Sequence, residues 1–346
     1  MTITGQPSGQ LGSEDTGPRL LRNGRGNLLH QAERFALLGL LILVCIFFSV
    51  LPKSSGTFPT SANIAVLTGN QIVTALLAIA EIFPLVSGNF DFSLGGNAAM
   101  ASCLTAGLMS RDHAPAIVAI AVAVLFGLAV GVVNGVLVCY TRMSSFVTTL
   151  GVATLLGGIV TWYTGGQTIT SSISQGLINF GSLDWLGLPR AVYLVAVVTL
   201  LAWYLLAQTP FGRRLYALGD NPRSARLVGI RVQREAFYAF VLAGLLAGIA
   251  GVLLTARNGG ATADTGTDLI FPALAAVFLG ATAVDPGRFN VLGTVIGVLF
   301  VAVAVSGLTL AGVSDWVQPV FNGCALIVAI GLSTYLARRR RGKDAL

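Results

Sequence analysis

Long apolar runs separated by short polar segments fill the chain from residue 35 to residue 337. A helix needs about 20 apolar residues to cross the ~30 Å hydrocarbon core of a bilayer. The runs are continuous and lack the alternation of apolar and polar positions that marks the strands of a membrane barrel. The pattern therefore predicts an all-α, polytopic transmembrane bundle of about ten spans. We place them at residues 35–51, 62–87, 94–110, 115–140, 146–164, 191–208, 236–256, 269–284, 291–311 and 317–337.

Composition supports a membrane protein. Of 346 residues, 54% are hydrophobic and 10% are charged, whereas soluble domains carry roughly 25% charged residues. Glycine is frequent and recurs at every fourth position in Gly127, Gly131 and Gly135. Such spacing lets helix backbones approach closely inside a bilayer. We therefore expect the lipid bilayer to surround the chain and small residues to hold its helices together.

Basic residues predict the orientation, because Lys and Arg are retained on the cytoplasmic side of a membrane. In the ten-span arrangement, all 21 Lys and Arg residues fall on one side except Lys53, Arg111, Arg190 and Arg257. Both termini are then cytoplasmic. The net charge of +7 is accounted for by this topology, and we expect no nucleic acid as a partner.

The ends of the chain are polar. Residues 1–32 are predicted to form a disordered cytoplasmic tail, since they are polar and rich in glycine. Residues 33–337 form the transmembrane domain, and residues 338–346 form a basic cytoplasmic tail. The first apolar run is longer than the core of a signal peptide, which favours an uncleaved first span.

The longest inner loop, residues 209–235, carries the densest run of charge. Asn221 is a favoured N-cap, Pro222 suits the first helical position and Gly229 is a natural C-terminal stop. These residues predict a basic helix of about two turns between them. It could dock into a groove on a partner or anchor the loop to anionic headgroups. Caps at both ends favour docking.

With this loop the chain resembles the ribose-type sugar permeases of ABC importers, which belong to a wider group that includes branched-chain amino acid permeases. The family pattern GRRxYAxGxNxxAAxxxGI is similar to Gly212–Ile230, NGxLVxxxxxxxFVxTLG to Asn134–Gly151, and GIDLSxG to Asn89–Gly95. Two departures stand out. Asp220 occupies a position where many relatives have glycine, and residues 280–293 keep only part of a glycine-rich stretch.

The resemblance implies a permease subunit driven by other polypeptides. The chain has no GxxxxGK[ST] motif, so ATP and Mg would be used by a separate ATPase subunit, with no cofactor bound here. The expected partners are two ATP-binding cassette subunits, a second permease copy or a related permease, and an extracytoplasmic solute-binding protein. The expected location is the bacterial plasma (inner) membrane. The resemblance assigns ATPase coupling to residues of the inner loop, namely Gly212, Arg213, Gly219, Asp220, Asn221, Pro222, Arg223, Ser224, Ala225, Arg226 and Gly229.

Polar and motif residues in the spans are candidates for the solute pathway, because ionisable groups are costly in a bilayer and are retained for function. Glu81 either lines a wet path or pairs with a neighbour, and Asp91 either gates the path or caps the next helix. Asn70 and Gln71 could bond sugar hydroxyls or join helices. The full set is Asn70, Gln71, Glu81, Asn89, Asp91, Ser93, Phe146 and Thr149.

Three functions fit these features. The favoured function is a permease of an ATP-driven importer that carries a monosaccharide or polyol delivered by a binding protein. The same machine carrying an amino acid or another small metabolite is the alternative, and an ion-coupled secondary transporter is a third. The sequence contains no combination of nucleophile, base and orienting group and no metal cluster, so we expect no catalytic residues, no metal and no enzyme activity. The long outer loop, residues 164–190, is either a half-inserted gate or a contact for the binding protein.

Overall fold

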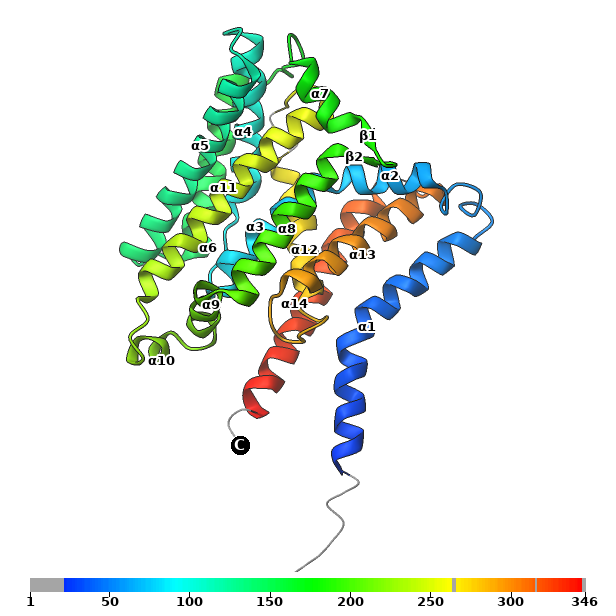
Figure 1. Cartoon of the computed structure of the whole chain (residues 1–346), viewed down its shortest axis with the longest axis vertical. Coiled ribbons are helices and arrows are strands. Elements are labelled where there is room, and N and C mark those ends of the chain that lie inside the picture. The colour runs from blue at the N-terminus through cyan, green and yellow to red at the C-terminus, as the bar shows by residue number, and fades with distance from the viewer. Residues whose placement is uncertain (1–21, 263–265, 315, 344–346) are drawn as a thin grey trace, which may run out of the picture.

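A computed structural model describes residues 22–262, 266–314 and 316–343. The described chain is a bundle of helices that run in alternating directions, with one small hairpin (Figure 1). In the hairpin, β1 (Asp184–Trp185) pairs antiparallel with β2 (Leu188–Pro189). The helices are α1 (Arg22–Val50), α2 (Ser61–Asn70), α3 (Ile72–Val86), α4 (Ser93–Ser110), α5 (Ala116–Gly135), the π-helix η2 (Val136–Tyr140), α6 (Ser145–Thr164), α7 (Gln175–Ser182), α8 (Arg190–Gln208), α9 (Pro210–Asp220), α10 (Pro222–Leu227), α11 (Val232–Asn258), the 3₁₀ helix η3 (Thr267–Leu269), α12 (Ile270–Gly280), α13 (Val291–Leu310) and α14 (Val317–Lys343).

The predicted all-α membrane bundle is confirmed for the described residues. Six helices are long and apolar enough to cross a bilayer, or seven if one bent pair is counted. Every expected run contains a helix, but α4 is rich in small and polar residues and lies buried inside the bundle. Helix α1 begins at Arg22, within the segment 1–32 that the sequence assigns to an N-terminal tail. Residues 1–21 lie outside the described residues.

Two of the expected spans were wrong in form. The run at 62–87 is split into α2 and α3, which meet at Gln71 with a bend of 46°. Next to the bend, the Arg257 side chain reaches over Gly69 and donates to Asn70 Oδ1 at 3.1 Å. The run at 269–284 is also interrupted. Its helix α12 has 11 residues and is about 16 Å long, too short for the ~30 Å core.

The centre of the bundle is α11, which packs against α3, α4 and α5. Small residues make this packing close, as their four-residue spacing predicts. A Cβ atom added to Gly127 would lie 2.5 Å from the Cα atom of Gly248, and one on Gly131 would lie 3.0 Å from Gly244 Cα. Larger apolar side chains fill the remaining core, with Phe83 and Phe240 almost fully buried. Exposed apolar side chains cover the outer helices, as a lipid-facing surface requires.

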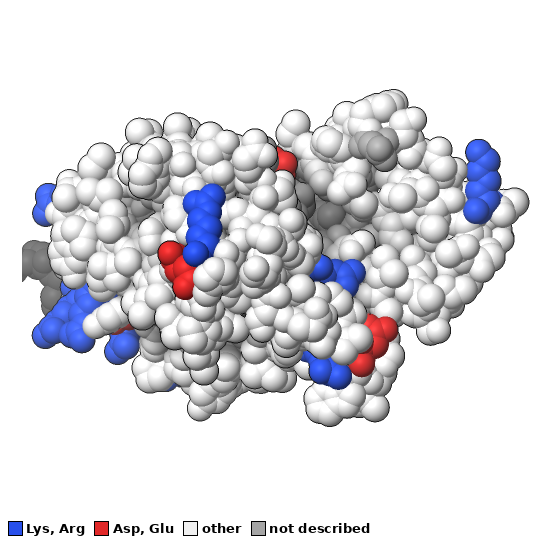
Figure 2. Space-filling model, turned by 90° about the horizontal axis from the view of Figure 1, so that it is seen from above, with Lys and Arg blue, Asp and Glu red and all other residues white. Residues whose placement is uncertain are grey.

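The two ends of the bundle differ. The start of α1, the end of α14 and the short helix α10 lie at one end, which we call the α10 end (Figure 1). The helices α2 and α7 and the β1–β2 hairpin lie at the other, which we call the α7 end. Seen from the α7 end, the surface carries only scattered charged side chains (Figure 2). The long loop at residues 164–190 contains α7 and the β1–β2 hairpin, both at this end.

Candidate functional site

Helix α10 has the caps that the sequence predicts. The Asn221 side chain accepts from the backbone N–H groups of Arg223 at 3.0 Å and Ser224 at 3.2 Å. Pro222 occupies the first helical position, and Gly229 has a φ of +83°, which favours glycine. Together these residues start the helix and then turn the chain back towards α11.

The surface of α10 combines charge with apolar side chains. Ala225 is buried against the protein, while the basic side chains of the helix face outward. At the helix C-terminus, Leu227 is 89% exposed, and the next residue, Val228, is 76% exposed. Two large apolar side chains so fully exposed beside arginines are typical of a surface that a partner covers.

A second helix, α9, precedes α10 and was missed from the sequence. Its signal was present, because Thr209 and Pro210 form the same cap that Asn221 and Pro222 form. The Thr209 hydroxyl accepts from Gly212 N at 3.4 Å. Gly212 lies directly against the carbonyl of Leu206 in α8, so no larger residue fits there. The inner loop is therefore a pair of helices packed on the bundle.

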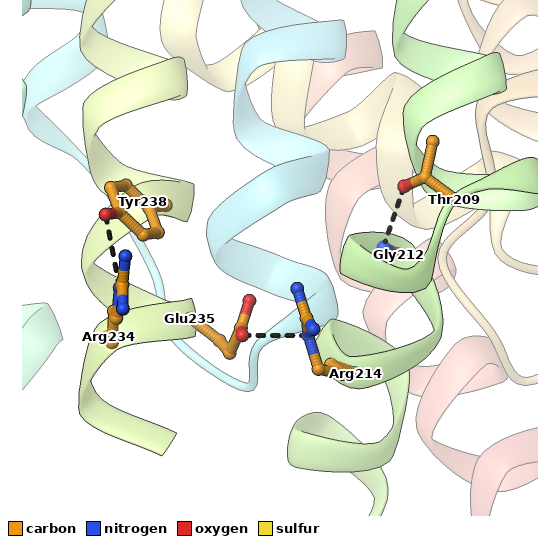
Figure 3. A network of polar contacts seen from close by, with 6 residues as sticks. All are labelled: Thr209, Gly212, Arg214, Arg234, Glu235 and Tyr238. Atoms are coloured by element: carbon orange, nitrogen blue, oxygen red, sulfur yellow. Dashed lines mark hydrogen bonds and ion pairs between the residues drawn. The ribbon is translucent and has the colours of Figure 1, made fainter. Parts of the chain in front are cut away.

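Helix α9 is joined to the start of α11 by an ion pair (Figure 3). Arg214 Nε lies 2.8 Å from Glu235 Oε1, and Glu235 is only 8% exposed. One helical position away, Arg234 Nε donates to the Tyr238 hydroxyl at 3.2 Å and stacks over its ring. A buried carboxylate requires its partner, so the pair fixes α9 relative to α11.

Helix α9 also contacts the junction between α3 and α4. Gly219 lies directly on the carbonyl of Val86, close to Gly88. Any side chain at position 219 would push α9 away from this junction. The resemblance assigns both Gly212 and Gly219 to coupling. The structure explains why each position holds a glycine, since only a residue without a side chain lets α9 touch the backbone of a membrane helix there.

A third contact ties α9 to the segment between α12 and α13. The Tyr216 hydroxyl donates to the Phe289 carbonyl at 2.8 Å. Asp220 forms an ion pair with Arg288, whose guanidinium group lies 5.3 Å from the centre of the Tyr216 ring. Burial raises the pKa of Tyr216 to about 12, against the lowering effect of Arg288, so the hydroxyl remains a donor even in alkaline solution.

The inner candidates for the solute pathway surround the α3–α4 junction. Asp91 Oδ1 accepts from Ser93 N at 3.0 Å and from Ser93 Oγ at 2.6 Å, and Glu81 Oε1 accepts from Asp91 N at 3.1 Å. Asn134 Nδ2 completes the network by donating to Ser93 Oγ at 2.7 Å. Asp91 therefore bonds the first residue of α4 as part of a buried polar network, and both of its predicted roles stay predictions.

The remaining inner candidates support the same junction. Thr149 Oγ1 accepts from Phe92 N at 3.0 Å, and the Phe146 ring packs edge-on against Phe92 at 5.1 Å. Asn89 Nδ2 donates to Ser87 Oγ at 2.9 Å. In these contacts they brace the loop from residue 87 to residue 92.

The outer candidates Asn70 and Gln71 lie apart from this group, about 15 Å along α3 from Glu81. They line a cavity at the α7 end together with residues that the sequence did not indicate, among them Asn63, Ser306 and Asn322. These polar residues stand singly in apolar runs. No pattern within α2, α13 or α14 shows that they converge, so only the packing of the helices reveals the site.

Comparison with known proteins identifies the family. Residues 63–330 match the family described as branched-chain amino acid transport system / permease component. The chain belongs to this permease family. Its relatives include the ribose import permease of Escherichia coli (strain K12), 33% identical over 86% of the permease and 92% of the relative. The ribose import permease of Bacillus subtilis (strain 168) is 36% identical over 85% and 90%. The D-allose transport system permease of Escherichia coli (strain K12) is 32% identical over 86% and 90%.

The match confirms the resemblance to ribose-type ABC permeases. No solved structure gives a significant match. The permease is a transport component, and as a relative of bacterial import permeases with several helices able to span a bilayer it is a multi-pass protein of the inner membrane.

Proposed function

We propose that this permease is the membrane-spanning subunit of an ATP-driven importer that carries a neutral monosaccharide or a related polyol. The observation that carries the proposal is the triple attachment of α9, which holds the capped, exposed helix α10 on the bundle. Names of the relatives point to ribose and allose, and the α10 surface supplies a place where a motor subunit can push.

In the proposed mechanism, two ATPase subunits bind the α10 end of two permeases, and a solute-binding protein docks at the α7 end. The partners expected from the resemblance thus fall on opposite faces. Closure of the ATPases around ATP moves α10 as a rigid body with α9. Helix α9 then transmits the displacement to the α3–α4 junction, to α11 and to the segment between α12 and α13, and alternating access follows from their rearrangement.

Rigid contacts make this transmission physically reasonable. The ion pair Arg214–Glu235 and the contact of Gly219 with Val86 hold α9 against the bundle. A displacement at α10 is therefore not absorbed within the loop. Packed interfaces of this kind switch between discrete arrangements instead of deforming gradually.

The alternative cargo is an amino acid, which the family description names. A zwitterion in a low-dielectric pathway needs countercharges for both its carboxylate and its ammonium group. The described residues that line the cavity at the α7 end are all uncharged. This lining favours a neutral solute.

Reconstitution tests the function. The permease is assembled with its ATPase and binding protein in proteoliposomes, and uptake of radiolabelled D-ribose, D-allose and L-leucine is measured with ATP inside or outside. We expect sugar uptake that depends on ATP at the ATPase face and no uptake of leucine. Leucine uptake without sugar uptake would assign the amino acid function. Uptake driven by an ion gradient in the absence of the ATPase would refute the ABC mechanism.

A further inference from the structure

A cavity of about 420 Å³ lies at the α7 end, between the bent pair α2–α3, the beginning of α12, and helices α13 and α14. About half of its lining residues are amides or hydroxyls. Those that matter most here are Asn63, Asn70, Gln71, Thr74, Ser306 and Asn322. Its volume falls within the range of small-molecule sites in proteins, roughly 300–1,000 Å³.

Asn322 is the strongest evidence that the cavity binds a polar solute. It lies on α14, is only 8% exposed and lines the cavity. Its Oδ1 atom has no hydrogen-bond partner in the part of the chain that the structure describes. Burying an unpaired amide in a membrane protein opposes folding, so such residues are retained where a partner arrives from elsewhere.

Other amides around the cavity are held in place by the protein. Ser306 Oγ donates to Asn63 Oδ1 at 3.2 Å, and Asn63 Nδ2 donates to the Phe58 carbonyl at 2.9 Å. Arg257 donates to Asn70 Oδ1, which orients the Asn70 amide nitrogen. Polar groups fixed before a ligand arrives lower the entropic cost of binding it.

The side chains that line the cavity indicate the class of solute that it would bind. Amides both donate and accept, as neighbouring hydroxyl groups on a carbon chain or ring do. Apolar side chains, including Val66, Leu269 and Val301, form the rest of the wall and suit the C–H faces of a sugar. Among the described residues, the lining has no charged side chain to neutralise a carboxylate, phosphate or ammonium group. A lipid acyl chain, the competing occupant, would leave the amides unpaired.

We propose that this cavity is an outer solute site inside a single permease subunit, which binds an uncharged polyhydroxylated molecule before it crosses. The proposal rests on the proposed function and adds the place where recognition occurs. The site lies at the break between two half-helices, where a bilayer protein can interrupt a helix because the freed backbone faces protein or a wet cavity.

Helix α12 links the site to the motor face. Leu269 and Pro272, around its beginning, line the cavity. At its other end Gly280 packs directly on Gly293, and the following segment carries Arg288, which α9 holds through Asp220. Displacement of α9 therefore reaches one wall of the solute site through one short helix.

The first experiment replaces Asn322 with leucine, which has a similar size and no hydrogen-bonding groups. In the reconstituted complex we expect Asn322→Leu to lower uptake of the labelled sugar about tenfold. ATP hydrolysis without solute should be unchanged. The matched control is Cys324→Leu, on an exposed part of the same helix, with uptake equal to wild type. Wild-type uptake in Asn322→Leu would overturn the proposal.

The second experiment tests the cavity independently of transport. The cysteines at positions 45, 103, 139 and 324 are replaced by alanine, and Ser306→Cys is compared with Val328→Cys on the exposed apolar face of α14. Methanethiosulfonate ethyltrimethylammonium, which is charged and enters only aqueous spaces, should modify the first variant and not the second. Absence of modification at position 306 would show a lipid-filled crevice and overturn the site. If wild type takes up no sugar while position 306 is modified, the sugar function fails and the aqueous site stands.

Discussion

Asp220 at the end of α9 forms an ion pair with Arg288 in the segment between α12 and α13. Both residues fall where the chain departs from the ribose-type sequence pattern, since many relatives have glycine at the first position and a glycine-rich stretch around the second. The two positions at which the chain departs from the family pattern therefore contact each other. They add a side-chain contact to the backbone contacts by which α9 touches the bundle.

Charge exchange across this pair should reveal its role in coupling. Both side chains are partly exposed, so the pair contributes only about 0.2–1 kcal/mol. We expect Asp220→Arg or Arg288→Asp to lower ATP-driven uptake about two- to fivefold at unchanged abundance, since 1.4 kcal/mol is about tenfold. The double exchange should restore it. Asp285→Ala removes a nearby carboxylate without a described ion pair and is the control. Failure of the double variant to recover would argue against a direct role.

The ion pair between Arg214 and Glu235 should matter more for stability. Arg214→Ala leaves a nearly buried carboxylate without its partner, whereas Glu235→Gln removes the charge and keeps the shape. We expect Arg214→Ala to cost about 1–2 kcal/mol, less than for a fully buried pair because the arginine is half-exposed. Glu235→Gln should cost less. Thermal unfolding in detergent measures both, with Arg213→Ala, at an exposed position, as the control. Equal losses for Arg213 and Arg214 would contradict the assignment.

Docking of the ATPase should depend on the shape and charge of α10. Gly229 requires a positive φ, which proline cannot adopt, and Arg226→Glu reverses charge on the exposed surface. We expect both variants to insert normally and to lose co-purification with the ATPase. Arg190→Glu, which reverses a charge at the α7 end, serves as the comparison. Retained co-purification in both variants would mean that α10 is not the docking element.

Local features of the fold could be predicted from sequence, and features made by distant residues could not. The caps of α10 involve residues within ten positions of one another, so Asn221, Pro222 and Gly229 are sufficient to indicate them. The contact of Arg257 with Asn70 beside the bend could not be predicted, because the two residues lie far apart along the chain.

The same reasoning applies to the candidate sites. The inner network joins Asp91 to Asn134, and the coupling segment joins Asp220 to Arg288. Each pair combines two positions in separate parts of the chain. Sequence reasoning found one member of each pair as a candidate residue, while its partner became visible only through packing. The cavity at Asn322 is the hardest to predict, since a single amide in an apolar run does not indicate which residues of other helices lie beside it.

Asp91 offers a test that separates capping from transport. Its Oδ1 atom accepts from Ser93 N at the start of α4, and asparagine can supply the same acceptor without the charge. We therefore expect Asp91→Asn to keep the cap and membrane abundance, while Asp91→Ala loses about 1 kcal/mol with the cap. We predict that the charge also serves transport. Asp91→Asn should then lower uptake per molecule several-fold. Abundance by immunoblot and uptake in the same vesicles decide the matter. Unchanged uptake per molecule in Asp91→Asn would leave capping as the only role, because a residue that acts in transport must change the rate of each folded molecule.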